Sequence, residues 1–258
     1  AVEAPATALA LVARDVEALK PAQLEAALAS HGIDTSPARL AELSINEVYP
    51  GYFTVYDPKL AEAAEQAGAA YLYSTADNPE RVHGILSGGQ KSSLTRYAEG
   101  ILIEGMSSAE DFNTGGARSV FSRLVTRSAI ERARASTETG SKARFNDWGG
   151  ERPYKLILDR RILGRTDWYG FTGDCYGDTK KVTGQNRGTN IIQAIDQKYS
   201  ASNEIMFPFG NDPKFVRGVV TSTEEQREQL IAYLTQRGIT EIQGRPLVEA
   251  IMVSSKLC

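Results

Sequence analysis

The sequence predicts an α+β protein in which a helical N-terminal lobe precedes a domain of mixed strands and helices. Apolar residues recur at helical spacing through an Ala-rich region, residues 6–68. From Ala69 onward, short apolar segments of strand character alternate irregularly with helical segments and with turns rich in Gly, Pro, Asn and Asp. We therefore expect two units, residues 1–68 and residues 69–258.

The individual elements follow from apolar runs and their flanking turn residues. Strands are expected at residues 70–75, 101–103, 119–125, 153–158, 205–207 and 215–220. Helices are expected at residues 57–68, 79–88, 190–198 and 222–238, where Asp, Asn, Ser or Pro opens the segment or Gly closes it. The strands at 205–207 and 215–220 are expected to form a hairpin. Residues 164–190 are expected to be irregular, and residues 239–251 to add a short strand-like segment.

Composition restricts the classes of function. The chain has 258 residues, 41% of them hydrophobic and 24% charged, as in an ordinary globular protein. A formal net charge of −3 gives no general attraction to nucleic acid or to an anionic membrane. The two cysteines make no disulfide framework, and the two histidines supply little for a metal cluster or a Ser-His-Asp hydrolase. We expect no metal site.

The chain has no apolar run of the roughly 18 residues that a membrane-spanning helix needs. Its first residues lack the basic start and continuous apolar core of a signal peptide. It opens at Ala1 without an initiator methionine, so we expect a processed product or a part of a longer polypeptide or assembly. The expected location is the cytoplasm, or a target cell if the chain is a delivered toxin fragment.

One stretch, residues 199–220, carries the strongest chemical signal. Its polar lead-in begins at the aromatic Tyr199 and ends at Glu204, directly before the apolar run Ile205–Phe207. A carboxylate at the start of a buried strand is costly unless it is paired or used in a site. A solvated Glu at an ordinary strand end is the alternative.

This stretch resembles the catalytic turn and strand of the ADP-ribosyltransferase superfamily, including its bacterial mono-ADP-ribosyltransferase toxins. In both, an aromatic residue, two spacers, a selectivity residue, one spacer and a Glu precede a strand that ends in Phe-Pro. The resemblance implies that Glu204 is catalytic and that Tyr199 and Ser202 contribute to acceptor selectivity. Because arginine-modifying members carry Glu at the position of Ser202, it implies an acceptor other than arginine, on a protein side chain or a nucleic acid.

Two further segments resemble the NAD-binding strands of the same superfamily. The first strand of the superfamily carries a His or Arg, at a place where this chain has Tyr73 or Ser74, followed by Thr75. A serine-rich element that supports the nicotinamide pocket would correspond to Ser107 and Ser108, or to Ser122 with Arg123. The resemblance thus implies a split antiparallel β-sandwich that holds NAD as substrate and needs no metal.

The implied function is an NAD-dependent mono-ADP-ribosyltransferase of toxin or effector type. An NAD glycohydrolase or an RNA 2′-phosphotransferase would use a similar fold. The missing His or Arg on the first strand favours a different class, a non-catalytic binding or structural module.

Two other features have open roles. Residues 118–144 are rich in Lys and Arg, which indicates a solvated face, a diphosphate site or a surface that guides a nucleic-acid acceptor. The aromatic residues of the segment 164–190 would either stack on a ligand or fill gaps in packing; they are Trp168, Tyr169, Phe171 and Tyr176.

Overall fold

The computed structural model describes residues 56–92, 119–135, 152–173, 183–198, 202–208 and 210–254. Most of the expected N-terminal lobe, the expected strand 101–103 and the residues Tyr199, Ser107, Ser108 and Tyr176 lie outside these ranges.

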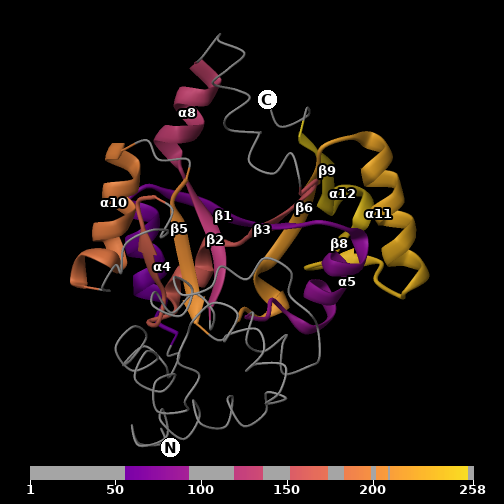
Figure 1. Ribbon diagram of the computed structural model, residues 1–258, viewed down its shortest axis with the longest axis horizontal. Helices are drawn as coiled ribbons and strands as arrows, with labels where there is room; N and C mark the ends of the chain where they lie inside the picture. The colour runs from indigo at the N-terminus through magenta and orange to yellow at the C-terminus, as the bar shows by residue number, and fades with distance from the viewer. Residues whose placement is uncertain are drawn as a thin grey trace, which may run out of the picture.

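A seven-stranded mixed sheet forms the centre of the described structure, with the strand order β4-β5-β2-β1-β3-β6-β9 (Figure 1). Neighbouring strands of the sheet are antiparallel, except for β6 and β9, which are parallel. Two short strands, β7 and β8, pair separately. The strands are β1 (Ala69–Ala76), β2 (Ser119–Thr126), β3 (Tyr154–Leu158), β4 (Tyr169–Phe171), β5 (Glu204–Pro208), β6 (Val216–Thr221), β7 (Glu241–Ile242), β8 (Arg245–Pro246) and β9 (Ile251–Val253).

Helices flank the sheet in two groups: α4 and α10 near its β4–β5 end, and α5, α11 and α12 near its β6–β9 end (Figure 1). The α-helices are α4 (Pro58–Gln66), α5 (Pro79–Gly88), α8 (Arg127–Ala135), α10 (Gly188–Lys198), α11 (Glu224–Gln236) and α12 (Leu247–Ala250). Short 3-10 turns occur at η2 (Arg160–Gly164), η3 (Gly184–Asn186) and η4 (Pro213–Phe215). The expected α+β class is therefore confirmed.

The helix boundaries follow from capping side chains. The carboxylate of Asp57 accepts a hydrogen bond from the backbone N–H of Lys59 at 3.0 Å and starts α4. Asn78 does the same for α5, by accepting from the N–H of Arg81 at 2.8 Å. Thr223 and Gln226 form a capping box at the start of α11. These caps supply acceptors for N–H groups that have no partner within the helix.

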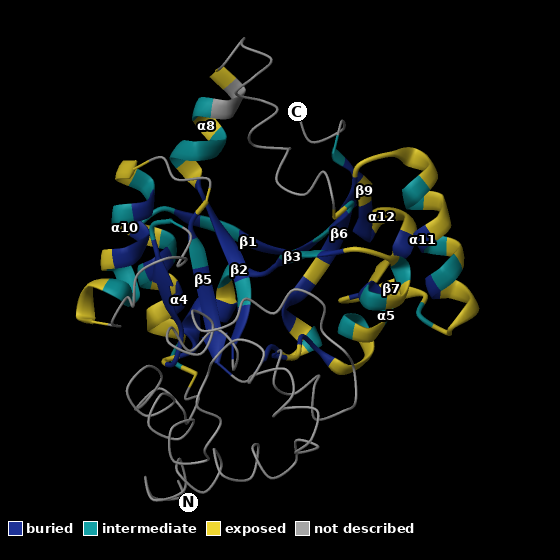
Figure 2. Cartoon of the chain, viewed as in Figure 1, coloured by how far each residue is buried: buried dark blue, intermediate teal, exposed yellow. Residues whose placement is uncertain are grey.

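The core lies between the helices and one face of the sheet. Alternate residues of the central strands point to that face, including Leu72, Leu124, Leu156, Ile205 and Phe207. They pack with buried residues of α4, α5, α10 and α11, and Figure 2 shows the buried strands beside helices whose outer surfaces are exposed. Removal of this apolar surface from water is the main stabilising contribution to the fold.

Strand β2 changes partner along its length. Its C-terminal half, from Arg123, pairs with β1, whereas its N-terminal half, to Ser122, pairs with β5. Where the β1–β2 ladder ends, the hydroxyl of Ser74 donates to the carbonyl of Phe121 at 2.8 Å and lies 3.0 Å from the hydroxyl of Ser122. Side-chain hydrogen bonds thus hold the two strands together where backbone pairing stops.

Three expectations about elements and their pairing were wrong. β5 and β6 form no hairpin, because β5 pairs with β2 and β4 while β6 pairs with β3 and β9. The segment 164–190 is not irregular throughout, since it contains β4 and the start of α10. Residues 239–251 form the β7–β8 pair, α12 and the start of β9 instead of one strand-like segment.

A buried ion pair lies between the segment that precedes β4 and the segment that follows β5. Arg165, which is 7% exposed, makes two hydrogen bonds to Asp167 at 2.8 and 2.7 Å. Its guanidinium also donates to the carbonyls of Pro208 and Gly210 and to the side chain of Asn211. Asn211 in turn pairs with Gln90 through backbone and side chain. One cation therefore joins the segment before β4 to the segment that follows β5.

We predict that Arg165→Met lowers the free energy of unfolding by about 3–5 kcal/mol, because it leaves a buried carboxylate without its cation. Urea unfolding monitored by circular dichroism measures this loss. The matched control is Arg81→Met, which removes an exposed pair with Asp77 and should cost less than about 1 kcal/mol. Equal losses for the two variants would contradict the prediction.

Candidate functional site

A row of side chains crosses four strands on the face of the sheet opposite the helix-covered core. Tyr73 of β1 lies opposite Arg123 of β2. The β2–β5 register pairs Ser122 with Ile205, so the next pair along is Arg123 with Glu204. Phe171 of β4 lies opposite Glu204 on its other side. Because directly opposite residues of an antiparallel sheet point to the same face, these four side chains form one cross-strand row.

The residues with the expected cofactor roles are divided between the two faces. Tyr73 and Arg123 share the face of Glu204, and so does Thr75, two residues from Tyr73 along β1. Ser74 and Ser122 point the other way, into the core, where they are buried and bonded to each other. The structure thus brings Tyr73, Arg123 and Glu204 together and places the two serines behind them.

Asn203 holds Glu204 in place. Its side-chain oxygen accepts from the N–H of Leu124 at 2.8 Å, and its amide nitrogen donates to the carbonyl of Leu124 at 2.9 Å. Asn203 is 1% exposed. Its amide therefore continues the β2–β5 ladder one step beyond the backbone pairing and fixes the position of the next residue, Glu204. The sequence offered only a weak signal for this role, an Asn directly before an apolar strand.

The face of Glu204 also carries two cations, Arg123 on the neighbouring strand β2 and Lys155 on the more distant strand β3. Lys155 of β3 lies opposite Thr75, and its Nζ is 5.7 Å from the centre of the Tyr73 ring. Burial raises the pKa of Tyr73 to about 12, although the charge of Arg123 acts in the opposite direction. Tyr73 therefore stays protonated at neutral pH and is able to donate a hydrogen bond. Sequence reasoning missed Lys155, because only the strand register places it beside Tyr73.

The remaining expected residues have other surroundings. Ser202 is exposed, two residues before Glu204. Trp168, Tyr169 and Phe171 are all buried, and the indole N–H of Trp168 donates to the carbonyl of Leu163 at 3.0 Å. Burial of all three rings favours the packing alternative, with Trp168 in the main core cluster and Tyr169 and Phe171 in a separate cluster on the face of Glu204. Tyr199, Ser107, Ser108 and Tyr176 lie outside the described residues.

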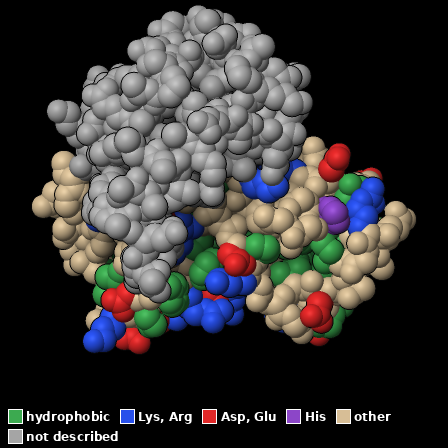
Figure 3. Space-filling view, turned by 90° about the horizontal axis from the view of Figure 1, so that it is seen from below, with side chains coloured by type: hydrophobic (Ala, Val, Ile, Leu, Met, Phe, Trp, Pro, Cys, Tyr) green, Lys and Arg blue, Asp and Glu red, His purple; other side chains and the backbone are tan. Residues whose placement is uncertain are grey.

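The described surface carries charges of both signs. Lys, Arg, Asp and Glu side chains are interspersed on the part of the face that Figure 3 draws in colour. Among the described residues, no three His, Cys, Asp or Glu side chains converge as metal ligands would. Within the same ranges, no helix combines the length and the apolar character required to cross a membrane.

Comparison with protein-family models and with curated proteins gave no match. Among solved structures, the chain resembles one described as "Thermosipho africanus DarTG in complex with ADP-ribose", with 15% sequence identity and a TM-score of 0.38. The likeness covers 71% of this chain and 49% of that chain, so it spans about half the length of the neighbour. Function must therefore be inferred from the geometry of the site itself.

We predict that Asn203→Leu lowers the free energy of unfolding by about 2 kcal/mol or more, because the buried N–H and carbonyl of Leu124 lose their partner. Chemical denaturation measures the change. Asn190→Leu is the control, since Asn190 is exposed on α10 and, within the described ranges, its side chain makes a single hydrogen bond, of 3.3 Å to the carbonyl of Gly184. The Asn203 role would be refuted by a variant as stable as this control.

Proposed function

We propose that this chain is an NAD-dependent mono-ADP-ribosyltransferase with Glu204 as its catalytic carboxylate. The observation that carries the proposal is the cross-strand row, in which Glu204 is the register neighbour of Arg123 and Arg123 is that of Tyr73. A carboxylate, a cation and a phenol are thereby held on one face, next to the point where β1 and β2 part. The change of partner within β2 supports a split antiparallel arrangement with NAD at the split.

The reaction needs one well-placed carboxylate. The bond between the ribose C1′ and the nicotinamide nitrogen breaks, and its electron pair leaves with nicotinamide. The positive charge that develops on the ribose is stabilised by Glu204, which also accepts a hydrogen bond from the 2′-hydroxyl. The acceptor then forms a bond to C1′ and loses its proton to solvent or to a nearby base.

Arg123 and Lys155 are assigned to the diphosphate of NAD. Both are cations on the face of Glu204, and a guanidinium suits phosphate oxygens because it donates two parallel hydrogen bonds. Tyr73, protonated at neutral pH, would donate a third hydrogen bond between them. In this proposal Arg123 of β2 and Lys155 of β3 replace the His or Arg that the resembled superfamily carries on its first strand. The buried pair Ser74–Ser122 joins β1 and β2 on the opposite face of the sheet.

Ser202 suits an acceptor that carries no charge. It is exposed and precedes Glu204 by two residues, and its hydroxyl brings no negative charge with which to hold a guanidinium. We therefore propose a hydroxyl, carboxamide or nucleobase as the acceptor. Water in the same position would make the protein an NAD glycohydrolase.

One observation favours a second candidate function, a module that binds NAD without cleaving it. The first strand presents Tyr73, a neutral side chain, to the face where the resembled superfamily has His or Arg. Nicotinamide release separates the two candidates.

We predict that Glu204→Gln slows nicotinamide release from NAD by about 10²-fold or more, because a neutral amide no longer stabilises the ribosyl cation. Release is followed by chromatography of the reaction mixture. Glu228→Gln, an exposed change on α11, should leave the rate unaltered. Full activity of Glu204→Gln would show that Glu204 is not the catalytic carboxylate. If the unaltered protein binds NAD but releases no nicotinamide, the non-catalytic module is the correct function.

We further predict that Lys155→Met raises the KM for NAD by about tenfold, which corresponds to about 1.4 kcal/mol, and changes kcat little. The loss falls on KM because the diphosphate is bound alike in the ground state and the transition state. The matched control is Lys214→Met, since Lys214 also lies over an aromatic ring, 5.2 Å from the centre of Phe215, but projects from a different part of the surface. An unchanged KM for Lys155→Met would exclude Lys155 from the NAD site.

A further inference from the structure

A cavity of about 450 Å³ lies between α4, the segment before β4 and the start of α10. This volume is within the range of about 300–1,000 Å³ that is typical of small-molecule sites. The cavity lies on the other side of the sheet from Glu204: its lining residues Ala64 and Trp168 belong to the core cluster into which Ile205 points. It is therefore distinct from the proposed NAD site.

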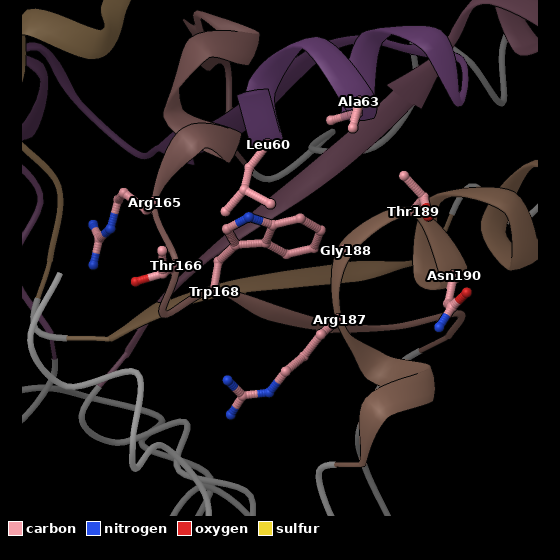
Figure 4. A pocket seen from close by; sticks show the side chains of 10 residues that line it. Leu60, Ala63, Arg165, Thr166, Trp168, Arg187, Gly188, Thr189 and Asn190 are labelled. Carbon is pink, nitrogen blue, oxygen red and sulfur yellow. The ribbon is translucent and has the colours of Figure 1, made fainter. Parts of the chain in front are cut away.

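One wall of the cavity is apolar and contains a fixed aromatic ring. Leu60 and Ala63 of α4 contribute to this wall, and Figure 4 shows Leu60 pointing toward the indole of Trp168. The hydrogen bond from the indole N–H to the carbonyl of Leu163 fixes the ring, which is 4% exposed. The ring therefore stays in place as part of the apolar wall.

The opposite wall is polar and positively charged. Thr189, Asn190 and Arg187 line it, and no acidic side chain is among the described residues that surround the cavity. Arg165 also borders the cavity, but its guanidinium points away from Trp168 and is satisfied by Asp167, Pro208, Gly210 and Asn211 (Figure 4). Arg187 makes no hydrogen bond or ion pair with its side chain inside the described ranges. Among the described residues, the half-buried guanidinium of Arg187 thus has no anionic partner.

We propose that this cavity binds a small planar anion, namely an aromatic or heteroaromatic ring that carries a carboxylate or a phosphate group. The ring would pack against Leu60 and Ala63 of α4, next to Trp168. The anionic group would pair with the guanidinium of Arg187. A guanidinium pairs with a carboxylate or with a phosphate. Probes that carry one group or the other therefore show which of the two the cavity prefers.

Tryptophan fluorescence tests the proposal directly. The chain has two tryptophans, so Trp148→Phe leaves Trp168 as the reporter. Benzoate and adenosine monophosphate are titrated beside their neutral partners, benzamide and adenosine, and beside inorganic phosphate. We expect a saturable change in emission with at least one of the two anionic rings, at a concentration at least tenfold lower than with its neutral partner or with phosphate alone.

Variants locate the site of binding. Arg187→Ala should weaken the effective anionic probe by about tenfold or more, and Arg187→Lys by less, because Lys keeps the charge but not the paired donors. Ala63→Phe should fill the cavity and abolish the effect of every probe; Ala63→Val serves as the smaller change if that variant folds poorly. Lys59→Ala removes an exposed cation from α4 that does not line the cavity and should bind as the parent does. Glu204→Gln and Lys155→Met should also leave binding unchanged, which separates this site from the NAD site.

Three results would overturn the proposal. The first is the absence of a saturable change with both anionic rings up to about 10 mM, beyond the roughly millimolar binding expected of a weak site. The second is equal binding of charged and neutral rings, which would indicate a purely apolar pocket. The third is unchanged binding in Arg187→Ala or in a folded Ala63 variant, which would place the ligand elsewhere.

Discussion

The change of partner within β2 is the constraint on which the described structure depends. Each backbone N–H and carbonyl must find a partner when it is buried, and a strand that leaves its neighbour exposes such groups. Here the hydroxyl of Ser74 and the amide of Asn203 take the place of backbone groups at the two points where a ladder ends. The sheet is thereby able to divide while these backbone groups of Phe121 and Leu124 keep hydrogen-bond partners. The cost is a pair of buried polar side chains that tolerate little substitution.

Along these strands, residues of the proposed site alternate with residues that hold the strands together. Along β1 and β2, neighbouring residues serve opposite faces: Ser74 and Ser122 join the strands from the core side, while Tyr73 and Arg123 project beside Glu204. The same division makes the site rigid, because the residues that carry charge stand on strands that are locked from behind. Preorganised charges cost little reorganisation energy during a reaction, which is why a rigid sheet suits stabilisation of a cation.

Local sequence patterns predicted most of the elements but not their pairing. Apolar runs between turn residues located β1, β2, β3, β5 and β6, because burial and turn chemistry are local properties. β4 was missed since a strand of three residues in an aromatic, Gly-rich segment has no periodicity to detect. Glu204, Tyr73 and Arg123 were expected as site residues from short motifs, whereas Lys155 and Asn203 were not. Their roles arise from the register between strands far apart in the chain, and the choice between Tyr73 and Ser74 as the residue beside Glu204 also required that register.

The sheet ends on both sides in strands of only three residues, β4 and β9. An edge strand is a template on which another chain can add, and the risk rises with its length. Strands this short offer few successive backbone groups for such an addition. Among the described residues, the brevity of both edge strands therefore disfavours edge-to-edge association, so the topology acts against aggregation as well as the surface charge.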